Sequence, residues 1–83
     1  MVLGKVVNTV VSTRKMESLV GYKIMVVNRV DQSGVETGEH LVAVDRVGAG
    51  IGEMVIVTTG DSARLACSDV ETPVDAVIVG IVD

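Results

Sequence analysis

Aliphatic residues recur in five short runs along the chain, separated by glycines or polar clusters. β-Strands are therefore predicted over residues 3–12, 22–30, 40–47, 53–59 and 74–82. Most runs carry aliphatic side chains at consecutive positions, as in Met54-Val55-Ile56-Val57, so both faces of these strands are apolar. A sheet with one wet face would alternate cleanly. The pattern indicates one face in a core and part of the other face against neighbouring molecules.

The segments between the runs read as turns, apart from one short helix. Residues 13–21 are polar, residues 31–39 contain Gly34 and Gly38 and predict a hairpin loop, and residues 48–52 predict a tight connection. Residues 62–67 can form one or two helical turns with Asp61 or Ser62 as the cap. These elements form a single domain over residues 1–83, an all-β, partly open barrel whose strand edges a ring of subunits would cover.

Composition adds a reason to expect assembly. Twenty of the 83 residues are valine and 48% are hydrophobic, more than one small core requires. The excess is either exposed or buried against other subunits, and the second explanation is favoured. The net charge of −4 and a single aromatic residue, Tyr22, argue against nucleic-acid binding, which needs basic and stacking surfaces.

Other classes of function find little support. Cys67 and His40 are the only residues of their kinds, so neither an internal disulfide nor a zinc site within one chain is expected. No apolar run approaches the roughly 20 residues that cross a bilayer, and the first residues do not resemble a signal peptide. The sequence thus predicts no cofactor, no metal and no membrane partner, and a location in the bacterial cytoplasm.

The segment Gly48-Ala49-Gly50-Ile51-Gly52-Glu53 invites comparison with a dinucleotide-binding loop. Glu53 stands where the third glycine would be, and a strand follows instead of a helix. The alternative is steric, because glycine reaches positive φ and allows another backbone to approach. The loop is therefore interpreted as a turn, a subunit contact or both, with Gly48, Gly50, Gly52 and Glu53 as structural or interface candidates.

The sequence indicates no general base beside either candidate nucleophile. A hydrolase based on Ser62 or Cys67 would need His40, and nothing in the sequence brings them together. Paired carboxylates, Asp45 with Glu53, would need a cleft that the sequence does not indicate.

Charged residues near the apolar strands are expected to be paired. Asp45 and Arg46 interrupt a hydrophobic strand and are predicted to bond across strands or across a subunit boundary. Arg64 is predicted to pair with Glu53 or Asp45, so Asp45 and Arg64 join the interface candidates.

The whole chain resembles the EutN/CcmL family of bacterial microcompartment vertex proteins. The most specific stretch is 43–55, AVDRVGAGIGEMV, which is similar to the family pattern of A-x-D followed by G-A-G-x-G-E and a strand. Three further stretches agree in order and spacing, namely 10–15 (VVSTRK), 60–64 (GDSAR) and 73–83 (PVDAVIVGIVD).

The resemblance implies an OB-like barrel that assembles as a pentamer and caps the corners of a polyhedral shell. The implied partners are further copies of the chain and hexameric and trimeric shell tiles, in a carboxysome or a metabolosome. A non-enzymatic role follows, with Gly60, Asp61 and Ser62 as candidates for a loop at the pore or axis. The alternatives are a single-stranded nucleic-acid-binding OB-type barrel and an adaptor ring of another assembly.

Overall fold

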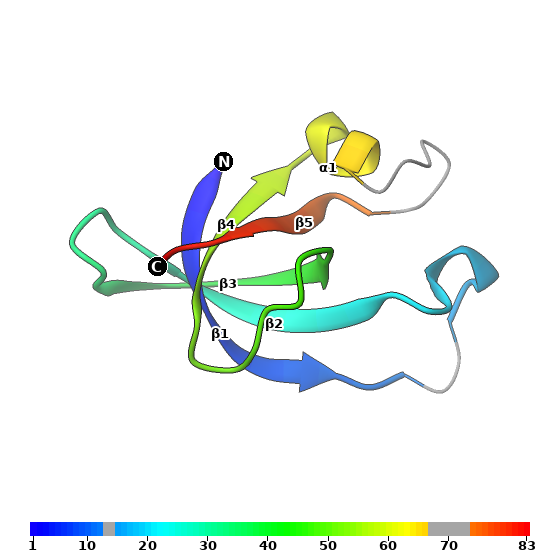
Figure 1. Ribbon diagram of the computed structural model, residues 1–83, viewed down its shortest axis with the longest axis horizontal. Helices are drawn as coiled ribbons and strands as arrows, with labels where there is room; N and C mark the ends of the chain where they lie inside the picture. Colours follow the sequence, from blue (N-terminus) through cyan, green and yellow to red (C-terminus); the bar gives the residue numbers. More distant parts are fainter. Residues whose placement is uncertain (13–14, 67–73) are drawn as a thin grey trace.

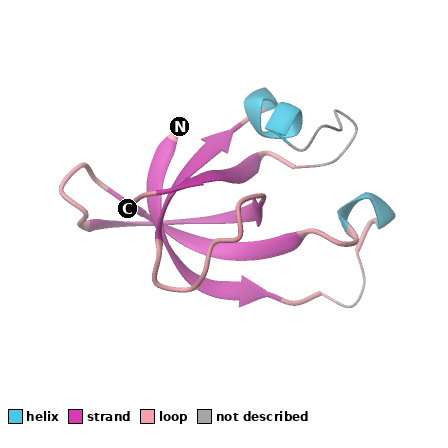
Figure 2. Cartoon of the chain, in the orientation of Figure 1, coloured by secondary structure: helices cyan, strands magenta, loops and turns pink. Residues whose placement is uncertain are grey.

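The computed structural model describes residues 1–12, 15–66 and 74–83, without the side chains of Ser18, Asp61 and Arg64. It contains five strands, one short α-helix and one 3-10 turn (Figures 1 and 2). The elements are β1 (Val2–Val10), η1 (Glu17–Leu19), β2 (Lys23–Val30), β3 (Glu36–Asp45), β4 (Met54–Thr59), α1 (Asp61–Ala66) and β5 (Ala76–Ile81). The predicted all-β five-stranded barrel is confirmed.

The strands form a closed barrel in the order β1-β2-β3-β5-β4. Every pairing is antiparallel except that of β3 with β5, which is parallel and joins only Val44 to Val77 and Asp45 to Ile78. The barrel is thus closed rather than partly open, but its last seam is narrow. Among the described strands, residues 36–43 of β3 pair only with β2, so one edge of this segment is open.

Aliphatic side chains fill the barrel, as the valine-rich strands require. The main core contains Val6, Met25, Val27, Ala43, Ala49, Val55, Val57, Ala76 and Ile78. A second cluster beside α1 and η1 contains Val44, Ala63, Val74 and Val77, with Leu19, Tyr22 and Ile24 packed against it. Two small clusters, rather than one large one, leave many aliphatic residues at the surface.

A glycine in β1 allows a close approach between strands. A Cβ at Gly4 would overlap the Val27 side chain and lie 3.1 Å from the carbonyl oxygen of Asn28. Gly4 is buried and pairs with Arg29 of β2, so a larger residue would push β1 away from its partner.

Most predicted boundaries agree within two residues, but β3 begins at Glu36 instead of residue 40. Its first five residues are exposed, because the β2–β3 hairpin extends beyond the barrel (Figure 1). Such an arm carries no hydrophobic alternation that could reveal it as a strand. The helix also starts earlier than predicted, at Asp61, so Gly60 precedes it and Ser62 lies in its first turn.

Candidate subunit interface

The loop between β3 and β4 is fastened to the barrel at its first end by Asp45. This carboxylate accepts hydrogen bonds from the backbone N–H of Val47 (3.0 Å) and of Gly48 (3.1 Å). Its side chain is only 2% exposed, and its Oδ2 lies 3.9 Å from Nζ of Lys23, the residue directly opposite on β2. The predicted cross-strand pairing of Asp45 is confirmed. Its buried carboxylate acts inside one chain and is not available to a neighbouring subunit.

The second end of the loop is fastened by Glu53 and by β1. The backbone N–H of Gly50 donates to Glu53 Oε1 at 2.6 Å, and the N–H of Glu53 returns a bond to the Gly50 carbonyl at 3.2 Å. Val6 of β1 accepts from the N–H of Gly52 (2.8 Å) and donates to the Glu53 carbonyl (3.0 Å). Lys23 Nζ also donates to the carbonyl of Ala49, at 2.9 Å. The loop therefore has a defined shape, and neither acid resembles a member of a catalytic carboxylate pair.

The glycines of this loop have different roles. Gly48 and Gly52 adopt φ values of +79° and +92°, which L-residues rarely adopt, as expected from the glycine pattern. Gly50 is not among the glycines with positive φ, so the interpretation of the loop glycines as positive-φ positions is wrong for Gly50. A Cβ at Gly50 would instead lie 3.3 Å from Glu53 Oε1, against the hydrogen bond that closes the loop.

Large aliphatic side chains remain exposed around the barrel. Val42 is 59% exposed on β3, Ile51 is 64% exposed at the tip of the loop, and Leu65 is 70% exposed on α1. Others at the surface are Met1, Val11, Met16, Val20, Val35 and Val47. Apolar side chains that gather at the surface of a folded domain mark sites of contact with other molecules, so these residues are candidates for contacts between subunits.

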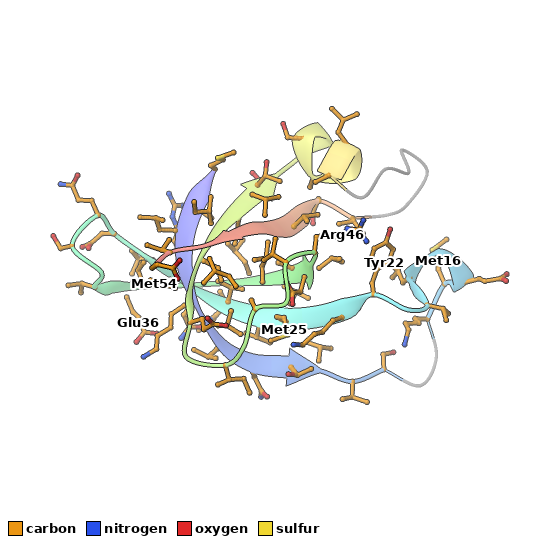
Figure 3. All side chains as sticks on the ribbon, viewed as in Figure 1. Met16, Tyr22, Met25, Glu36, Arg46 and Met54 are labelled. Atoms are coloured by element: carbon orange, nitrogen blue, oxygen red, sulfur yellow. The ribbon has the colours of Figure 1, made fainter. Side chains whose placement is uncertain are left out.

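Arg46 lies over the ring of Tyr22, with its guanidinium carbon 5.6 Å from the ring centroid (Figure 3). Arg46 follows β3 and Tyr22 precedes β2, so this contact joins the ends of two neighbouring strands. The predicted bond of Arg46 across strands or across a subunit boundary stays a prediction. The predicted pairing of Arg64 falls on a side chain outside the described part, and stays a prediction.

His40 and Ser62, two of the residues considered for nucleophilic catalysis, lie on separate elements. His40 Nδ1 is 2.7 Å from Asn28 Oδ1 on the exposed hairpin, and Asn28 in turn donates to Glu36 at 2.6 Å. Ser62 is exposed on α1, while Cys67 lies outside the described residues. Within residues 1–12, 15–66 and 74–83, no group of three potential metal ligands occurs. Nor does the described part contain a helix long and apolar enough to span a membrane.

The candidates for a pore or axis loop lie at the junction of β4 and α1. Gly60 has a φ of +69°, and its N–H donates to the carbonyl of Asp75 at 2.8 Å. The Asp61 side chain lies outside the described part of the chain. A role of Gly60, Asp61 and Ser62 at a symmetry axis stays a prediction.

The complete chain, residues 1–83, matches the sequence family described as "Ethanolamine utilisation protein EutN/carboxysome". The chain belongs to the EutN/CcmL family. A curated relative, the "Bacterial microcompartment shell vertex protein GrpN" of Rhodospirillum rubrum, is 52% identical over 83 residues, which are 100% of this chain and 93% of GrpN. The "Carboxysome shell vertex protein CcmL" of Gloeobacter violaceus is 41% identical, over 100% of this chain and 83% of CcmL.

A solved EutN/CcmL structure has the same fold. It is described as "GrpN pentameric microcompartment shell protein from Rhodospirillum rubrum", with a TM-score of 0.92 and 52% identity. The match covers 100% of this chain and 94% of that structure. The sequence-based assignment to this family is thereby confirmed.

Sequence reasoning missed three residues of this region. Lys23 could have been found from the register of the second and third strands, which places it opposite Asp45. Ile51 has a weak signal in the sequence, because it is a large aliphatic residue placed between two glycines. Val42 has no signal in the sequence. Its exposure follows from the shortness of the β3–β5 pairing, which depends on the tertiary structure.

Proposed function

We propose that this chain is a structural, non-enzymatic shell subunit that forms pentamers and caps the vertices of a bacterial microcompartment. The observation that carries the proposal is the full-length correspondence with shell vertex proteins, one of them described as a pentamer in its solved structure. The exposed aliphatic residues and the open edge of β3 support it, because a subunit ring would remove both from water.

Geometry explains why a shell needs such a piece. Tiles of six-fold symmetry pack into flat or rolled sheets, so a closed polyhedron requires units of different symmetry at its corners. A head-to-tail interface that closes after a fixed rotation generates a ring of this kind. The proposed partners are further copies of the chain, then hexameric and trimeric shell tiles, and the proposed location is the shell in the bacterial cytoplasm.

The chemistry of the described residues favours this role over an enzymatic one. His40 bonds to Asn28, and Asp45 and Glu53 are engaged by backbone N–H groups of one loop. A nucleic-acid-binding barrel would need basic and aromatic surfaces, whereas the net charge is −4 and Tyr22 is the only aromatic residue. The adaptor-ring alternative differs from the vertex role only in the identity of the partner.

Native mass spectrometry of the purified chain at micromolar concentration tests the assembly, with a pentamer as the expected species. Co-expression with hexameric shell tiles then tests the vertex role, since closed particles should form only when this chain is present. A stable monomer in the first experiment would contradict the proposal. Pentamers that leave the tiles as open sheets would favour the adaptor ring.

A further inference from the structure

The tip of the β3–β4 loop presents one isoleucine from a rigid support. Ile51 is 64% exposed and stands between Gly50 and Gly52, while the bonds of Asp45 and Glu53 fix the loop on both sides. A Cβ at Gly52 would meet nothing within 4 Å, so the space beside Ile51 is open to another molecule. A side chain on a preorganised loop loses little conformational freedom on binding, which suits it as an interface anchor.

An apolar groove lies at the narrow seam between β3 and β5. It has a volume of about 210 Å³. Apart from Asp75 its lining is aliphatic and includes Leu19, Ile24, Val42, Val44 and Val74. Val42, at 59% exposure, stands at the end of the open β3 edge and extends the apolar surface outward. An apolar cavity of about 150 Å³ holds benzene, which has six carbons. The groove therefore has room for the four-carbon side chain of isoleucine.

The loop tip and the groove belong to opposite sides of the barrel. In the closed order β1-β2-β3-β5-β4, the seam between β3 and β5 is the point farthest from β1. The loop is bonded to β1 through Val6, whereas the groove has no lining residue on β1. Ile51 is not among the residues that line the groove of its own chain, so the Ile51 that would enter this groove belongs to a second copy.

We infer that Ile51 of one copy inserts into the β3–β5 groove of the next copy, beside Val42, and that this contact repeats around the ring. The inference rests on the proposed pentamer and assigns the two surfaces that form it. A contact between two different surfaces is heterologous, the type that closes into a ring after a fixed rotation. It also covers the end of the open β3 edge, a feature that folded proteins seldom leave unprotected.

Cross-linking tests the contact directly. The variant Ile51→Cys/Val42→Cys, in a Cys67→Ala background, is treated with a short bis-maleimide and run on a denaturing gel. The expected product is a ladder of covalent species that extends to the pentamer. The matched control is Ile51→Cys/Val35→Cys, because Val35 is similarly exposed (61%) but lies in the hairpin loop between β2 and β3. The control should remain monomeric on the gel.

The possible results separate the contact from the pentamer itself. If native mass spectrometry shows pentamers but the two introduced thiols of Ile51→Cys/Val42→Cys do not cross-link, the contact is wrong and the proposed function stands. A cross-link that forms only within single chains would also contradict the inferred contact between Ile51 and the groove. Absence of pentamers in the unmodified protein would contradict the proposed function instead.

A charge substitution gives an independent measurement. Ile51→Asp and Val42→Asp should each raise the concentration at which pentamers dissociate by at least about tenfold, since each places a charge in an apolar contact. Val35→Asp should leave that concentration within about twofold of the wild-type value, because an exposed loop position loses no apolar contact. Circular dichroism checks that each barrel is folded. Folded Ile51→Asp pentamers with wild-type stability toward dilution would overturn the inference.

Discussion

Lys23 and Asp45 face each other across β2 and β3, where β3 ends and the glycine-rich loop begins. Asp45 binds the first N–H groups of the loop, and Lys23 binds the carbonyl of Ala49 further along. One residue from each strand thus holds the same loop. The cross-strand pair is 3.9 Å apart and the Lys23 side chain is 49% exposed, so the attraction between their charges contributes little compared with these hydrogen bonds.

Replacing Asp45 should therefore destabilise the chain through the loop. Asp45→Ala removes the acceptor of two backbone N–H groups and is expected to lower the free energy of unfolding by about 2–3 kcal/mol. Asp45→Asn keeps an oxygen at the same place and should lose less than half as much. Urea denaturation of both variants at one fixed protein concentration is the measurement. Equal losses would mean that the charge, and not the acceptor, holds the loop.

Gly4 should tolerate no side chain. Gly4→Ala places a Cβ against Val27 and near the backbone of Asn28, which cannot move without disturbing the β1–β2 pairing. The expected loss is about 3 kcal/mol. Gly80→Ala is the matched control, because its Cβ would lie in ordinary contact, 3.5 Å from Ile56 Cδ1. Thermal melting of both variants gives the comparison, and similar melting temperatures would argue against the close approach.

The two glycines that flank Ile51 should respond differently to alanine. Gly52 has a φ of +92°, so Gly52→Ala forces a strained backbone conformation that costs about 1–2 kcal/mol. Gly50→Ala meets only Glu53 Oε1 at 3.3 Å, and a small shift of that carboxylate should keep the loss below about 1 kcal/mol. Denaturation curves should rank the variants in this order. The reverse order would show that the Gly50–Glu53 bond dominates the loop.

The sequence predicted the strands well where their side chains are half buried. Val55 and Val57 of β4 are fully buried, while Met54 and Ile56, which alternate with them, are only partly covered. The hydrophobic pattern did not predict that β3 begins at Glu36, because this exposed hairpin arm is held by pairing with β2 and not by burial. Nor could the sequence predict that Gly52 has a positive φ and Gly50 does not, because each φ depends on how the loop closes onto Val6 and Glu53.

The three residues considered for nucleophilic catalysis should be dispensable. His40→Ala, Ser62→Ala and Cys67→Ala are each expected to leave pentamer formation and incorporation into shells unchanged. His40 and Ser62 are exposed on separate elements, and exposed positions of this kind change stability by less than about 0.5 kcal/mol. Native mass spectrometry and particle imaging provide the readout. A variant that assembles normally but abolishes shell function would contradict the non-enzymatic role.

Deleting the gene should leave the shell open while the cargo enzymes remain active. Six-fold tiles alone favour flat or rolled sheets, so the deletion strain is expected to contain elongated or open bodies. Containment should fail in living cells, whereas enzyme activity in extracts should be unchanged, because this chain is proposed to contribute no chemistry. Electron microscopy and extract assays measure the two effects. A second vertex gene must first be excluded, and in its absence normal closed polyhedra would refute the vertex role.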